Sequence, residues 1–290
     1  MLTTLAPAKV NLYLHVGAVQ PNGRHPLDSL VMFAGPEAAD RVSADSAGKL
    51  SLNVTGPRAD GLETGTDNLV LQAAQALCEA EGRARGAALK LEKHLPVAAG
   101  IGGGSADAGA ALRLLQELWS LEPGLVRQIA VPLGGDVPVA LEGRTALMQG
   151  EGEIVRPQEG LPSLPAILVN PGVDCPTGRV FRAFDESGGG AGFQKVPSVP
   201  KGGQVSDLIA WLKEQRNDLE APARQLVPEI GNVLNTLSNL SGSRLARMSG
   251  SGATCFALFE TFEAAQSAAN ALMDVHPDWW IRATRLGDAP

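Results

Sequence analysis

Cysteine is scarce in this chain, with only Cys78, Cys175 and Cys255 among 290 residues. An odd number of scattered cysteines, without a Cys-x-x-Cys pair, suggests neither a disulfide framework nor a cysteine zinc site. The four histidines also lack metal-ligand spacing, so the residues predict no metal held by the protein itself. We therefore expect a protein of a reducing, cytoplasmic compartment.

Positive charge and long apolar runs are also in short supply. A formal net charge of −7 and a pI near 5.2 argue against a nucleic-acid-binding protein. No run approaches the ~18 consecutive apolar residues of a membrane span, and the N-terminus lacks a signal-peptide pattern. Because aromatic residues make up 4% and hydrophobic residues 44%, Ala, Leu and Val must fill the core. We expect neither nucleic-acid nor membrane partners.

The hydrophobic period predicts a chain of mixed α and β structure. A length of 290 residues predicts one large domain or two smaller ones. A stretch rich in Pro and Gly from Pro157 to Pro165 is the candidate boundary between domains 1–157 and 158–290. The segment from Ser187 to Gln204 has no hydrophobic period and is expected to be a loop. The main elements predicted are strands at Leu2–Val16 and Leu27–Ala34, a hairpin of Arg41–Ala44 with Lys49–Val54, a helix over Leu69–Glu81 capped by Thr66 or Asp67, and a helix ending at Trp119.

A glycine-rich stretch precedes that second helix. Glycines that open a helix leave backbone N–H groups free at the positive end of the helix dipole, which is a phosphate site. The stretch lacks the lysine of a Walker loop and the third glycine of a dinucleotide fingerprint. A flexible loop is the alternative, but so many glycines exceed the need of one turn. The candidate phosphate-binding residues are Pro96, Val97, Ala98, Ala99, Gly100, Ile101, Gly102, Gly103, Gly104, Ser105 and Ala106.

Three further segments place polar groups where chemistry could use them. Lys9 and Asn11 lie two apart in a predicted strand, so their side chains share one face. Asp136 follows two glycines in a constrained turn, and Gly250 to Ala253 is a tight turn of small residues. Each has a plain alternative: a solvated edge lysine, a turn-capping aspartate and a strand connection.

In this order, the segments resemble the GHMP kinase superfamily, whose phosphate loop reads Pro-x-x-x-Gly-Leu-Gly-Ser-Ser-Ala. The resemblance covers most of the chain, and each motif is weak by itself while the ordered set is specific. It rests on Ala6 to Leu12, Asp67-Asn68-Leu69, Pro96 to Ala106, Gly135 to Pro138, Asn170-Pro171-Gly172 and Gly250 to Ala253.

The resemblance implies an α+β fold of two domains with the active site in the cleft between them. It implies that Asp136 is the base that deprotonates a substrate hydroxyl, with Lys9 as its electrostatic partner. ATP would lie on the glycine-rich loop and near Asn68, with Mg²⁺ carried mostly by phosphates and water. The loop is then expected across the cleft from Lys9 and Asp136. Substrate contacts would come from Asn11, Arg24, His25, Phe181, Gly250, Ser251 and Gly252.

The longer glycine run resembles the branch of the superfamily that phosphorylates the 2-hydroxyl of a cytidine diphosphate-linked methylerythritol, in non-mevalonate isoprenoid synthesis. There His25 would hydrogen-bond the cytosine and Phe181 would stack on it, with the Arg24 guanidinium in place of the family's second aromatic ring. Ala98 and Ala99 replace glycines of many relatives, which predicts ordinary backbone angles at the loop entry. Alternatives are a homoserine or mevalonate kinase and a non-catalytic nucleotide sensor. A monomer or a homodimer is expected.

Overall fold

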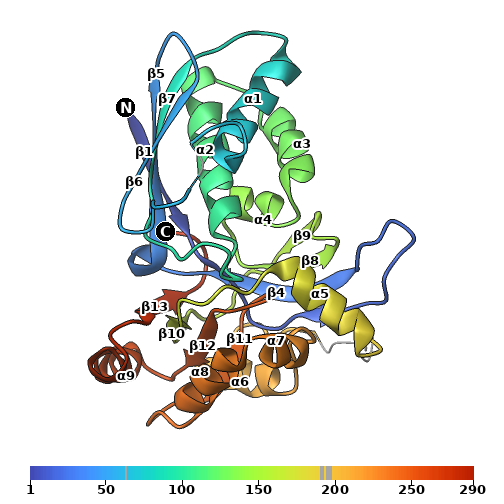
Figure 1. The fold of residues 1–290 in the computed structure, drawn as a ribbon, viewed down its shortest axis with the longest axis vertical. Coiled ribbons are helices and arrows are strands. Elements are labelled where there is room, and N and C mark those ends of the chain that lie inside the picture. Colours follow the sequence, from blue (N-terminus) through green and yellow to red (C-terminus); the bar gives the residue numbers. More distant parts are fainter. Residues whose placement is uncertain (63, 190–192, 194–197) are drawn as a thin grey trace.

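The computed structural model describes residues 1–290 except 63, 190–192 and 194–197. Its upper part is a four-stranded sheet with helices packed on one face (Figure 1). In sheet order the strands are β1 (Leu2–Pro7), β5 (Ala39–Ser46), β7 (Ala87–Glu92) and β6 (Ser51–Thr55), and the covering helices are α1 (Leu69–Glu81), α2 (Gly103–Trp119) and α3 (Pro123–Leu133).

The lower part is a second α+β layer (Figure 1). Its sheet runs β11 (Leu245–Met248), β12 (Cys255–Leu258), β10 (Leu164–Asn170) and β13 (Trp280–Leu286), with all pairs antiparallel. The helices of this part are α5 (Thr177–Glu186), α6 (Val205–Lys213), α7 (Glu220–Leu226), α8 (Pro228–Ser238) and α9 (Phe262–Val275).

A third sheet joins the two parts. It runs β2 (Lys9–Asn11), β4 (Leu27–Phe33), β8 (Ala146–Gly150) and β9 (Ile154–Pro157), and β3 (His15–Val16) also pairs with β4. One apolar cluster contains Leu30 of this sheet together with Leu164 and Phe256 of the lower sheet. The short helices α4 (Val137–Glu142) and η1 (Pro36–Ala38) complete the described elements.

The two long helices beside the glycine-rich stretch are confirmed at α1 and α2. The cap of α1 differs from the prediction, because the side chain of Asn68, and not Thr66 or Asp67, accepts the Val70 N–H at 3.0 Å. Asn and Asp are equally good caps, so residue type could not choose between neighbours. Helix α4 was not foreseen, since its six residues are too few for a periodic signal.

Two strand predictions are wrong. The predicted hairpin does not form, because β7 lies between β5 and β6, antiparallel to the first and parallel to the second. A local turn cannot reveal that a strand from later in the chain enters between its arms. The predicted first strand is divided into β1, β2 and β3, and the first two join different sheets.

The predicted loop from Ser187 to Gln204 lies partly outside the described residues. Within the described part of the chain, no helix combines the length and the apolar character needed to cross a bilayer.

Candidate active site

The glycine-rich stretch folds as a loop that turns into the N-terminus of α2. Gly100 and Gly102 have φ of +73° and +62°, which glycine adopts at no steric cost. Gly102 caps α2, and the first helical N–H groups after it have no partner within the helix. Ala98 has φ +50°, so the prediction of ordinary angles at both alanines is wrong for this residue. The loop therefore accepts strain at Ala98 to keep its shape.

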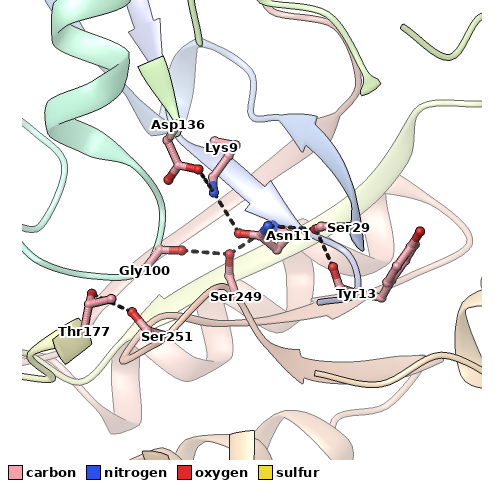
Figure 2. Close-up of polar contacts among 9 residues, drawn as sticks. All are labelled: Lys9, Asn11, Tyr13, Ser29, Gly100, Asp136, Thr177, Ser249 and Ser251. Carbon is pink, nitrogen blue, oxygen red and sulfur yellow. Dashed lines mark hydrogen bonds and ion pairs between the residues drawn. The ribbon is translucent and has the colours of Figure 1, made fainter. Parts of the chain in front are cut away.

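The turn that contains Ser249 and Gly250 packs against the glycine-rich loop at Gly100. A Cβ on Gly100 would lie 2.5 Å from the Ser249 carbonyl oxygen, and one on Gly250 would lie 2.7 Å from the Gly100 carbonyl oxygen. The Ser249 hydroxyl donates to that Gly100 oxygen at 3.0 Å and accepts the Asn11 N–H at 3.1 Å (Figure 2). The two turns, far apart in sequence, therefore form one backbone surface that excludes side chains.

The Lys9 ammonium forms an ion pair with Asp136 at 2.9 Å and donates to Asn11 Oδ1 at 2.9 Å (Figure 2). The Lys9 side chain is only 5% exposed, whereas that of Asp136 is 32% exposed. The shared face predicted for Lys9 and Asn11 is thus confirmed. The prediction that Lys9 lies across the cleft from the loop is wrong. The backbone N–H of Lys9 donates to the carbonyl oxygen of Ile101, a loop residue, at 2.9 Å.

A second lysine lies under the same loop, and no sequence motif pointed to it. Lys93 Nζ contacts one carboxylate oxygen each of Asp40 and Asp107 at 2.5 Å, and all three side chains are buried. Burial raises the pKa of Asp107 to about 8, against the opposing attraction of Lys93. Burial lowers the pKa of Lys93, but the two carboxylates outweigh it and the net shift is upward. This triad joins β5, the end of β7 and the first turns of α2.

Two cavities border the loop, and a third adjoins the second of them. A cavity of about 290 Å³ lies at the start of α1, and it shares Ala98 and Gly103 with a cleft of about 440 Å³. The cleft shares Glu151 and Phe181 with a third cavity of about 530 Å³. Because neighbouring cavities share lining residues, two ligands could lie next to one another over the loop.

The cavities collect most of the predicted site residues. The first contains Asn68, Pro96, Val97, Ala98, Gly103 and Gly104. The cleft contains Lys9, Asn11, Ala98, Ala99, Gly100, Gly102, Gly103, Gly104, Ser105, Asp136, Phe181, Gly250 and Ser251. The third contains Arg24, His25 and Phe181. Three predicted residues line none of these cavities, namely Ile101, Ala106 and Gly252.

In the third cavity, the rings of His25 and Phe181 stack with centroids 5.2 Å apart. His25 Nδ1 lies 2.9 Å from the Gly17 carbonyl oxygen, which can only accept, so Nδ1 carries a proton. The Arg24 guanidinium forms an ion pair with Glu151 at 2.8 Å, and its side chain is 71% exposed.

Several polar groups of the site escaped sequence reasoning. Glu151 borders both the cleft and the third cavity, Thr177 shares a hydrogen bond of 2.8 Å with Ser251, and Asp185 lies 3.3 Å from His25 Nε2. None belongs to a recognisable motif. The amphipathic pattern of α5 was a usable signal for Asp185, since it places that residue one turn after Phe181 on the same helix face.

The fold and the site define a small-molecule kinase of the GHMP class. Residues 68–144 match the family model for the N-terminal domain of GHMP kinases, and residues 200–277 match the one for their C-terminal part. A 4-diphosphocytidyl-2-C-methyl-D-erythritol kinase of Hyphomonas neptunium is 57% identical over 291 residues, covering 100% of this chain and 98% of that protein. The chain belongs to the GHMP kinase superfamily and, within it, to the family of these cytidine-diphosphate-methylerythritol kinases.

Solved structures agree with this assignment. A crystal structure of 4-(cytidine 5'-diphospho)-2C-methyl-D-erythritol kinase superposes with a TM-score of 0.78 at 36% identity, covering 99% of each chain. A homoserine kinase from Cytophaga hutchinsonii superposes with a TM-score of 0.71 at 17% identity, covering 99% of this chain and 95% of that one. The second match shows the shared fold alone. The predicted two-domain α+β GHMP fold is therefore confirmed.

Proposed function

We propose that this protein uses ATP to phosphorylate the 2-hydroxyl of 4-diphosphocytidyl-2-C-methyl-D-erythritol, in the non-mevalonate route to isoprenoids. The substrate is that named by its full-length relatives. The observation that carries the reaction type is the ion pair of Lys9 and Asp136 in the cleft beside the glycine loop. A non-catalytic nucleotide sensor would have no need of this pair.

The loop and the first cavity are assigned to ATP. The free N–H groups at the start of α2 suit phosphate oxygens, and the adjoining cavity beside Asn68 and Val97 suits the base. Because phosphoryl transfer needs little covalent help, positioning and charge balance would supply most of the rate.

Asp136 is assigned as the base. Its Oδ1 is bound to Lys9, while the partly exposed carboxylate remains open to the cleft for the proton of the substrate hydroxyl. Lys9, paired with this carboxylate, would balance the negative charge that develops on the transferred group.

Mg²⁺ is assigned to the nucleotide. Among the described residues, no group of three or more His, Cys, Asp or Glu side chains could hold a metal ion. Mg²⁺ commonly binds substrate phosphates and waters with few protein ligands, which fits this site. When bound, the ion would neutralise phosphate charge; Ser105, in the cleft, is the loop hydroxyl available to it.

The third cavity is assigned to the cytidine end of the substrate. Phe181 offers a ring face, and the polar side chains that line this cavity are Arg24, His25, Glu151, Arg182 and Asp185. In the predicted stacking, the face of the Arg24 guanidinium would lie on the cytosine while its edge can stay paired with Glu151.

A substrate panel tests the function. Purified protein with ATP and Mg²⁺ is expected to release ADP when given 4-diphosphocytidyl-2-C-methyl-D-erythritol, and not when given homoserine or mevalonate. ADP release with either of the other alcohols, and none with the cytidine compound, would overturn the substrate assignment. Binding of ATP without turnover of any of them would favour the sensor.

A further inference from the structure

A fully buried serine lies behind the proposed catalytic pair. Ser29, on β4, has no exposed surface, and its neighbours Asn11 and Lys9 are only 2% and 4% exposed. Its Oγ lies 2.5 Å from the Tyr13 carbonyl oxygen and 2.8 Å from Asn11 Nδ2 (Figure 2). Hydrogen bonds thus run without a break from the Tyr13 carbonyl to Asp136.

Hydrogen-bond chemistry fixes the direction of this chain. A carbonyl oxygen carries no hydrogen, so the Ser29 hydroxyl must donate its single proton to Tyr13. The Ser29 oxygen can then only accept, and its partner is the NH₂ group of Asn11. The amide of Asn11 is thereby held with Oδ1 turned toward Lys9, which is the orientation that an ammonium group needs.

This orientation determines how the ammonium of Lys9 is used. Of its three N–H groups, one is directed to Asn11 and one to Asp136, which leaves the third for a ligand in the cleft. Oδ1 and Nδ2 of Asn11 each make one hydrogen bond inside the protein, and these two bonds hold Lys9 in place.

We infer that Ser29 is a positioning residue for phosphoryl transfer: through Asn11 it fixes the Lys9 ammonium against Asp136 and the cleft. The inference rests on the function proposed above. A purely structural alternative is that Ser29 only satisfies a buried carbonyl, in which case its loss would lower stability and leave turnover unchanged.

Two variants of equal shape separate these roles. Ser29→Thr and Ser29→Val give isosteric side chains that each add one branch methyl, but threonine keeps the hydroxyl whereas valine replaces it with a second methyl. With both substrates saturating and well below the unfolding temperature, we expect Ser29→Val to lower kcat about ten- to a hundredfold, with KM for ATP little changed. Ser29→Thr should retain most of the kcat.

A double-mutant cycle adds a second readout. Ser29→Ala and Asn11→Ala should each lower kcat, and the double variant should be no slower than Asn11→Ala alone, because both act through one amide. Thermal unfolding of each variant shows that the measured enzyme is folded.

Two results would overturn the inference: equal kcat for the threonine and valine variants, or losses in kcat that multiply in the double variant. Failure of the proposed function is distinct, since the unmodified protein would then release no ADP with the cytidine substrate.

Discussion

Two buried lysines lie on either side of the start of α2. A Cβ on Gly102 would lie 3.4 Å from Lys9 Cε, and one on Gly103 would lie 3.3 Å from Lys93 Nζ. Lys93 is enclosed with Asp40 and Asp107, whose side chains are 0% and 4% exposed. The carboxylate bound to Lys9, by contrast, is 32% exposed and opens to the cleft.

The difference teaches how to separate a structural ion pair from a reactive one. Burial and pairing are common to both lysines, and pairing alone is weak support for either stability or function. What distinguishes Lys9 is that its partner carboxylate keeps an open side, where a substrate proton could be accepted. On this basis Lys93 anchors the loop and Lys9 serves the chemistry, and four predictions test this comparison.

The largest effect is expected from Asp136→Asn. This change keeps the shape of the side chain and removes the base, so kcat should fall by about 10²–10⁴-fold. ATP binding should remain, because Asp136 does not line the first cavity. The checks are ADP release at saturating substrate and calorimetric titration with ATP. Turnover within a few-fold of the unmodified enzyme would remove Asp136 from the reaction.

The next effect is a contrast between the two lysines. Lys93→Met leaves two carboxyl groups buried without their cation, so the free energy of unfolding should fall by about 3–5 kcal/mol. Lys9→Met is the matched control, since its partner Asp136 is partly solvated; it should lose turnover with a much smaller loss of stability. Urea unfolding measures the stability of the two variants, and ADP release at saturating substrate measures their kcat. A larger loss of stability in Lys9→Met than in Lys93→Met would contradict the roles assigned to the two lysines.

A smaller effect concerns pH. The pKa of Asp107 is about 8 in the folded protein and near its ordinary value of 3.8 when unfolded, so folding binds a proton between these values. Stability from this group is therefore lost as pH rises from about 4 to about 8, at no more than ~1.4 kcal/mol per pH unit.

Asp107→Asn tests this prediction, because the amide imitates the protonated acid. Unfolding free energies measured from pH 4 to pH 8 should decline less steeply with pH in this variant than in the unmodified protein. An identical slope in the two proteins would show that Asp107 is ionised throughout and that Lys93 lies in a simple ion pair.

The smallest effect lies in the loop between the two lysines. Ala98 has φ +50°, so Ala98→Gly should raise the free energy of unfolding by about 1 kcal/mol. Ala99→Gly is the control, because Ala99 is not among the residues with positive φ and should lose about 0.5–1 kcal/mol instead. Equal effects of the two substitutions in denaturant unfolding would show that Ala98 is not strained.

Local patterns in the chain were enough to predict α1 and α2, the glycine-rich loop and the face shared by Lys9 and Asn11. These features depend on residues close in sequence, where apolar period and glycine conformation act directly. The order of the strands in the sheets could not be predicted in this way. Strand β7 begins more than thirty residues after β6 ends, and yet it lies between β5 and β6. The contact of Asp185 with His25 could not be predicted in this way either, because it joins residues remote in the chain.

The sequence by itself determined the class of protein, since motifs in a fixed order carried the GHMP resemblance, and it singled out Lys9, Asp136 and the loop. Only the tertiary structure decided that Lys9 lies beside the loop, that Gly250 packs against Gly100, and that Ser29 supports Asn11. Each of these depends on a distance between residues remote in the chain. Such distances are set by how the three sheets pack, which no local pattern encodes.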